Sequence, residues 1–171
     1  VLANTLYELH QRNIFHRDIK PTNIIVINKF PYLIDFGISK SSDSIDITGN
    51  NAIGPKYTMA PEVKTASKEE RKSLDWSKAD TYSFAISAWI IITSQEKGFE
   101  GSYNIKSSIA LKNFISDDNI HLLNKALISG TKIDPKFRCS SKEIVEHFLR
   151  WYNFNGKFLP SKSIQWENMI E

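Results

Sequence analysis

Cysteine, long apolar runs and basic clusters are all scarce in this sequence of 171 residues. The single cysteine, Cys139, excludes a disulfide within the chain and favours a reducing, cytoplasmic setting. The longest apolar run lies within residues 84–92, well short of the roughly 20 residues that a membrane-spanning helix needs. Lysine and arginine number 22 against 19 acidic residues and form no dense block, so we expect no nucleic-acid partner.

Hydrophobic spacing in the first part of the chain predicts one helix and one β-hairpin. Leucines recur at helical spacing from the start, in a pattern that ends near residues 11–13. A β-branched run at 24–27 and a second apolar run at 32–36 are separated by Asn28 and Lys29, which can turn the chain. This part of the sequence therefore predicts a helix followed by a small antiparallel hairpin.

The second part of the chain predicts three further helices. Residues 82–92 are apolar on every helical face, which is typical of a helix buried in the middle of a domain, and we expect that helix to begin near Ser77. A later helix is expected to begin with Asp117 or Asp118 as its N-cap. A capping-box pattern at 140–143 precedes the last amphipathic stripe.

Several side chains that could take part in a reaction lie in the polar sequence HRDIKPTN at residues 16–23. This sequence contains a proline and is expected to be a loop. Phosphoryl transfer to a hydroxyl needs a carboxylate that orients the hydroxyl and accepts its proton, and positive charge beside the phosphoryl oxygens. It also needs oxygen ligands for Mg²⁺. Asp18, Lys20 and Asn23 would supply these three groups within one short loop.

A second group of this kind is Asp35-Phe36-Gly37, at the end of the second predicted strand. Asp35 would be the carboxylate that holds Mg²⁺ against the phosphates. Gly37 gives the backbone freedom to turn sharply there. The composition of the following residues, 37–51, is that of a loop.

These two stretches resemble the catalytic loop and the Asp-Phe-Gly motif of eukaryotic-type protein kinases. The resemblance continues with Ala-Pro-Glu at 60–62, the start of the central helix at 80–85 and Asp-Pro-x-x-Arg at 134–138. Five motifs in family order are a strong signal, although each alone is weak. The resemblance implies an α+β, protein kinase-like fold, of which this chain holds only the C-terminal lobe, mostly α-helical with a small hairpin.

The resemblance also implies the roles of individual residues. Asp18 and Lys20 would be catalytic. Lys20, Asn23, Ile25 and Asp35 would contact ATP, with Ile25 as the floor under the adenine ring. Asn23 and Asp35 would hold Mg²⁺. The implied partners are therefore ATP and a protein substrate.

Further residues would, by resemblance, support the site from within the fold. His16 and Phe36 would stack in the hydrophobic spine that joins the two lobes. Asp80 would anchor the backbone of the catalytic loop from the central helix. Glu62 would pair with Arg138 inside the lobe.

Two parts of the family pattern are missing or altered. No Gly-x-Gly occurs, and neither does the lysine-bearing strand that follows the Gly-rich loop, so we interpret residues 1–155 as a C-terminal lobe without its N-terminal lobe, and 156–171 as a tail. Pro55 stands where Ser/Thr kinases have a threonine whose hydroxyl contacts the catalytic Asp and Lys, and Thr58 stands where an aromatic is usual. Arg17 would meet a phosphate on the activation segment, if one is added.

The function implied is transfer of the ATP γ-phosphoryl group to serine or threonine hydroxyls of proteins. A pseudokinase that acts as a binding scaffold is the alternative from another class, and tyrosine or dual specificity is the alternative within the enzyme class. Other titratable residues have simpler interpretations. His10, His121 and His147 lack metal-ligand spacing and are expected to be surface or packing residues, and Cys139 is expected to be an inert thiol.

Overall fold

The computed structural model describes residues 1–36 and 55–154, with the side chains of Pro55, Lys56 and Phe154 left out. The predicted loop at 37–51, including Gly37, therefore lies outside the described residues, and so does the tail at 156–171. The elements are α1 (Leu2–Gln11), β1 (Ile24–Ile27), β2 (Phe30–Leu33), α2 (Pro55–Thr58), α3 (Pro61–Thr65), α4 (Trp76–Thr93), α5 (Ile120–Gly130) and α6 (Ser141–Phe154). Short 3-10 turns cover Pro21–Asn23, Glu70–Ser73, Leu111–Asn113 and Pro135–Phe137.

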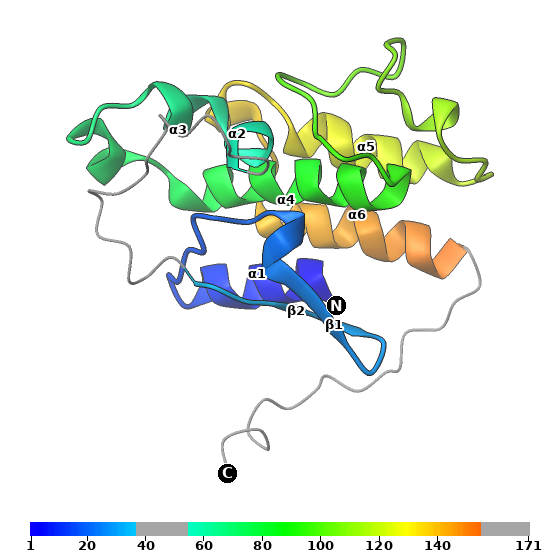
Figure 1. Cartoon of the computed structure of the whole chain (residues 1–171), viewed down its shortest axis with the longest axis horizontal. Helices are drawn as coiled ribbons and strands as arrows, with labels where there is room; N and C mark the ends of the chain where they lie inside the picture. The colour runs from blue at the N-terminus through cyan, green and yellow to red at the C-terminus, as the bar shows by residue number, and fades with distance from the viewer. Residues whose placement is uncertain (37–54, 155–171) are drawn as a thin grey trace.

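Helix α4 runs through the middle of the structure with α5 and α6 against it (Figure 1). Asp75 caps its start, since the carboxylate accepts hydrogen bonds from the backbone N–H groups of Ser77 and Lys78. Burial raises the pKa of Tyr82 on this helix to about 12, and its hydroxyl donates to the carbonyl of Gly101. Among the helices of residues 1–36 and 55–154, none has the length and hydropathy required to cross a bilayer.

Helix α6 packs on α4 and α5 and also on α1, so it links the N-terminal helix to the later helices. The predicted capping box is present at its start. The N–H of Ser140 donates to Glu143 Oε2 at 2.8 Å, and the N–H of Glu143 donates to Ser140 Oγ at 3.3 Å. Phe148 packs edge-on against Phe84 of α4, with ring centroids 5.7 Å apart.

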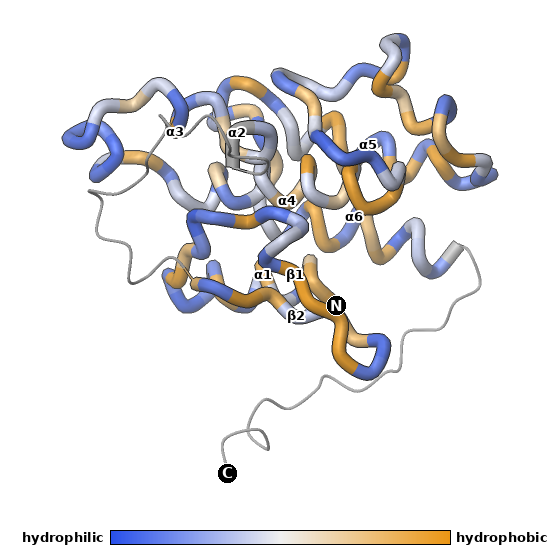
Figure 2. Tube along the Cα trace, in the orientation of Figure 1, coloured by the Kyte–Doolittle hydropathy of each residue, from blue (hydrophilic) through white to orange (hydrophobic). Residues whose placement is uncertain are grey.

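The hairpin lies beside α1, at the opposite side of the structure from α5 (Figure 1). Asn28 and Lys29 both have positive φ, which is the conformation of a type I′ two-residue turn. The pair Ile27–Phe30 therefore closes the ladder, and the second strand covers 30–33 rather than the predicted 32–36. The observed strand includes Pro31, whose missing N–H an edge strand tolerates. Figure 2 shows the hydrophobic strands on either side of this hydrophilic turn.

The start of α5 also differs from the prediction. Its N-cap is Asn119, with no side-chain capping bond, rather than Asp117 or Asp118. Asp117 has other partners, because Oδ1 accepts from the N–H of Asn119 and Oδ2 accepts from Trp151 Nε1 at 2.9 Å. The carboxylate therefore forms a local turn and ties α6 to this loop.

Candidate active site

Asp80 of α4 is the anchor on which the candidate site is built. Its buried carboxylate accepts a hydrogen bond from the N–H of His16 at 2.7 Å and another from the N–H of Arg17 at 2.8 Å. Arg17 has a φ of 67°, a region that non-glycine residues rarely occupy. The two bonds hold the strained start of the loop in place, which is the arrangement expected where backbone geometry serves function.

His10 is a partner of Asp80 that the sequence interpretation missed. Its Nε2 lies 3.3 Å from Asp80 Oδ2, and the side chain is buried. A signal was available, because His10 follows the fully buried Leu6 by four residues and so lies on the same face of α1. Of the two expected roles, surface or packing, the structure gives His10 the packing role, and its contact is with the anchor of the loop.

Asp18, Lys20 and Asn23 converge within the loop. Lys20 Nζ donates to Asp18 Oδ2 at 2.9 Å. Asn23 Nδ2 donates to the same carboxylate oxygen at 3.1 Å and to the backbone carbonyl of Asp18 at 2.8 Å. The 3-10 turn Pro21–Asn23 brings the amide back to Asp18. The side chains of Asp18 and Lys20 are 20% and 18% exposed, so the pair is reachable from solvent.

The Asp-Phe-Gly segment lies next to this loop. The N–H of Ile34 donates to the backbone carbonyl of Asn23 at 2.9 Å, so Asp35 follows a residue that is bonded directly to the loop. Asp35 is exposed and has a φ of 59°. Ile25 lies on β1, where it pairs with Tyr32 of β2, and its side chain is exposed.

The donor set at this place fits Mg²⁺. Both amide hydrogen bonds of Asn23 go to Asp18, so the amide oxygen of Asn23 is directed away from that carboxylate. Asp35 adds an exposed carboxylate. Mg²⁺ is commonly held by one or two protein oxygens together with phosphates and water. The described residues contain no group of three His, Cys, Asp or Glu that could hold a metal without such phosphates.

His16 connects the two loops through its ring. Its Nε2 lies 2.9 Å from the carbonyl oxygen of Ile34, and its Nδ1 accepts from the N–H of Asp18 at 3.3 Å. A carbonyl oxygen only accepts, so the tautomer with hydrogen on Nε2 satisfies both bonds. The ring is fully buried and packs against Phe36 with centroids 4.9 Å apart, as the resemblance implied.

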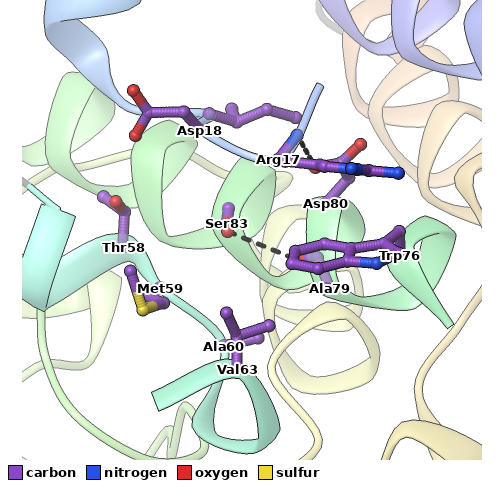
Figure 3. Close-up of a pocket in the computed structure, with 11 residues that line it drawn as sticks. Arg17, Asp18, Thr58, Met59, Ala60, Val63, Trp76, Ala79, Asp80 and Ser83 are labelled. Carbon is purple, nitrogen blue, oxygen red and sulfur yellow. Dashed lines mark hydrogen bonds between the residues drawn. The ribbon is translucent and has the colours of Figure 1, made fainter. Parts of the chain in front are cut away.

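A small pocket opens beside the loop at residues 16–23, between the segment before α3 and the start of α4 (Figure 3). The guanidinium of Arg17 lies over the indole of Trp76, 4.9 Å from the ring centroid. Trp76 Nε1 donates to the carbonyl of Arg71 at 3.1 Å, which fixes the indole. The sequence interpretation missed Trp76, because nothing in its spacing distinguishes it from an ordinary apolar residue at a helix start.

The predicted pair of Glu62 and Arg138 is present. Arg138 Nη1 and Nη2 donate to the two carboxylate oxygens of Glu62 at 2.6 and 3.0 Å. Its remaining hydrogen bonds go to the backbone carbonyls of Lys78, Lys132 and Ile133, so all five N–H groups have acceptors. This pair connects α3, α4 and the turn before α6.

The sequence of residues 1–149 matches the family model described as protein kinase domain. The chain belongs to the protein kinase family. This kinase chain is 33% identical over 162 residues to serine/threonine-protein kinase cds1 of Schizosaccharomyces pombe, covering 85% of this chain and 33% of that protein. It is 35% identical over 156 residues to dual specificity protein kinase zak2 of Dictyostelium discoideum, covering 86% of this chain and 22% of that protein.

Among solved structures, the kinase chain is similar to the Rad53 kinase domain, crystallised with SCD2 in complex with AMPPNP. The TM-score is 0.57 at 21% identity, over 95% of this chain and 58% of that chain. At this identity the likeness shows the fold alone, which is protein kinase-like, mostly helical, with a two-stranded antiparallel hairpin. The kinase chain spans about a third of the length of cds1.

Proposed function

We propose that the full-length protein transfers the γ-phosphoryl group of ATP to serine or threonine hydroxyls of protein substrates. The observation that carries this proposal is the convergence of Lys20 and Asn23 on the Asp18 carboxylate, in a loop tied to Asp80. A scaffold without catalytic activity has no need of a cation, a carboxylate and an amide held together at a partly exposed position.

Asp18 would orient the acceptor hydroxyl and take its proton. The hydroxyl oxygen forms a bond to the γ-phosphorus while the bond from that phosphorus to the β–γ bridging oxygen breaks, and ADP leaves with the bridging electron pair. Lys20 Nζ, at 2.9 Å from Asp18 Oδ2, would lie beside the phosphoryl oxygens as they move between the two. Positioning and electrostatic stabilisation provide most of the rate in this reaction.

ATP and Mg²⁺ would be held at the junction of the two loops. Lys20, Asn23, Ile25 and Asp35 would contact the nucleotide, and Asn23 and Asp35 would hold the metal. When bound, Mg²⁺ would neutralise charge on the phosphates. The backbone bond from Ile34 to Asn23 supports this proposal, because it keeps both metal-binding side chains on adjoining segments.

The choice of serine or threonine over tyrosine rests on Lys20. A cation two residues after the catalytic carboxylate is close enough to meet the phosphoryl group of a short acceptor side chain. Pro55 favours the opposite choice, since it resembles the tyrosine-kinase platform. We weigh Lys20 more heavily because it would act on the reacting group itself.

We further propose that residues 1–155 are the C-terminal lobe of the kinase domain and that 156–171 form a tail. The exposed apolar side chains of the hairpin support a covering lobe at this place. Val26 is 68% exposed and Ile27 is 50% exposed. Clustered apolar exposure of this kind marks a surface that another part of a protein covers.

The test is phosphorylation of a generic protein substrate by the purified full-length protein with radiolabelled ATP and Mg²⁺, followed by phosphoamino-acid analysis. Phosphoserine or phosphothreonine is expected as the main product. Phosphotyrosine as the main product would overturn the specificity. No product, together with nucleotide-independent binding of partner proteins, would favour the pseudokinase scaffold instead.

A further inference from the structure

Arg17 is held at two points by one face of helix α4. Its backbone N–H donates to Asp80 Oδ1 at 2.8 Å, and its guanidinium lies over the indole of Trp76, 4.9 Å from the ring centroid. Trp76 and Asp80 are four residues apart on α4, so their side chains lie on the same face of that helix. Figure 3 shows Arg17 above the indole, with its hydrogen bond to Asp80 as a dashed line.

The indole of Trp76 is itself fixed in place. Its Nε1 donates to the backbone carbonyl of Arg71 at 3.1 Å, and the half-buried ring packs against the core. Arg71 Nη2 in turn donates to the carbonyl of Val63 on α3 at 3.3 Å. The ring cannot turn without losing its bond to Arg71, so its face is presented to the loop at residues 16–23. Tryptophan is the best aromatic partner for a cation, and a planar guanidinium stacks well on such a ring.

The backbone of Arg17 needs a hold of this kind. Its φ of 67° lies in the left-handed region, which a residue other than glycine keeps only where its surroundings over-determine the conformation. The bond to Asp80 fixes the amide of Arg17, and the stack on Trp76 fixes its side chain. Asp18 is the next residue in the chain, so a relaxation of Arg17 would also turn the carboxylate that Lys20 contacts.

We propose that Trp76 is a positioning residue, which acts through Arg17 to keep the Asp18 carboxylate in its orientation for the reaction. This inference rests on the proposed kinase function, since it concerns the orientation of the proposed base. A small displacement of a group that must meet the reacting atoms lowers the rate severely, even when the cause of the displacement lies outside the site. Trp76 does not contact the proposed nucleotide-binding residues, so its effect belongs to turnover rather than to ATP binding.

The test compares Trp76→Leu with Trp76→Phe in the full-length protein. Leucine removes the aromatic face, so kcat is expected to fall about 10-fold, the size of a partly desolvated cation–π contact, with KM for ATP unchanged. Phenylalanine keeps a ring under the guanidinium, and its kcat is expected to stay within about 3-fold of the original. An unchanged kcat in Trp76→Leu, or a phenylalanine variant as slow as the leucine variant, would overturn the inference.

Trp151→Leu is the matched control, because Trp151 also packs against the core and donates through Nε1, but to Asp117 from α6. Its kcat is expected to stay unchanged. Arg17→Met shows whether Trp76 acts through Arg17, since methionine keeps an unbranched side chain and removes the cation. In that background, Trp76→Leu is expected to change kcat by less than about 2-fold. A further 10-fold loss there would contradict the role through Arg17.

A second measurement separates this inference from the kinase proposal. In a thermal-unfolding cycle of Arg17→Met, Trp76→Leu and the double variant, the two single losses in Tm are expected to sum to more than the double loss, because the stack is lost only once. Additive losses would contradict the stack even in an active enzyme. An inactive wild-type protein with a non-additive cycle would overturn the proposed function and leave the hold of Trp76 on Arg17 supported.

Discussion

Arg138 and Lys20 each pair with a carboxylate, but their surroundings differ in almost every respect. Arg138 is fully buried, and its five N–H groups are all directed at acceptors, two of them on Glu62. Lys20 makes one bond to Asp18 at a partly exposed position. The first pair has no capacity left for a ligand, whereas the second can still meet one.

The two pairs also differ in the range of chain that they connect. Arg138 lies 76 residues from Glu62 and also binds carbonyls on α4 and on the loop after α5. Lys20 lies two residues from Asp18, in a loop whose position is set elsewhere, by Asp80. We infer that the buried pair stabilises the fold and the exposed pair serves the reaction, so substitutions at the two should affect different measurements.

The largest expected effect is on activity, at Asp18. In the full-length protein, Asp18→Asn should lower kcat by about 10²–10⁴-fold, the usual contribution of a positioned base. Its Tm should change little, because the side chain is partly exposed. Asp118→Asn, at an exposed position, is the control for a charge change alone. If Asp18→Asn instead lowers Tm as much as a substitution of Arg138, the inference that only the buried pair stabilises the fold is wrong.

The next effect is on stability, at Arg138. Arg138→Ala leaves Glu62 as a largely buried charge without its partner, and should cost about 3–5 kcal/mol in free energy of unfolding. Chemical denaturation of this chain measures it. Lys136→Ala, two residues away and exposed, should change the free energy by less than about 0.5 kcal/mol. Equal losses in the two variants would contradict a structural role for the pair.

Long-range features with a clear motif could be predicted from the sequence. The Glu62–Arg138 pair, the tie from Asp80 to the catalytic loop and the stacking of His16 on Phe36 all followed from the kinase resemblance and are present. Helices α1, α4, α5 and α6 followed from apolar spacing and, for α6, a capping box, whereas the short helices α2 and α3 were not predicted. The start of α5 was wrong by one or two residues, because local spacing does not reveal that Asp117 is held by Trp151.

Contacts that depend on tertiary packing could not be predicted in the same way. Trp76 lies under Arg17 only because α4 passes below the catalytic loop, and no local pattern records that crossing. His10 reaches Asp80 by the same crossing. The pocket beside this loop also could not be predicted, because it exists only once α2, α4 and the loop are assembled.

A substitution of Asp80 should affect both stability and activity, because Asp80 belongs to the buried helix and holds the exposed loop. Asp80→Asn replaces one acceptor oxygen with an N–H₂ group, so one of the backbone N–H groups of His16 and Arg17 loses its acceptor. An unsatisfied buried donor costs about 1–3 kcal/mol. Both the free energy of unfolding and kcat should fall. A loss of stability with full activity would show that the loop does not need this anchor.

The smallest expected effect is at the capping box of α6, far from both pairs. Ser140→Ala should cost about 0.5–2 kcal/mol in free energy of unfolding at pH 7. Bonds from the backbone N–H and then the hydroxyl of Ser140 lower the pKa of Glu143 below its ordinary 4.5. This contribution to stability is therefore present above pH 4.5 and is lost as pH falls through the folded-state pKa. In Ser140→Ala the backbone N–H still donates, so thermal melts from pH 7 to pH 3 should show a weaker pH dependence than the original chain, whereas Glu143→Gln should remove this contribution completely. An unchanged pH dependence in Glu143→Gln would mean that the box adds nothing to the charged form.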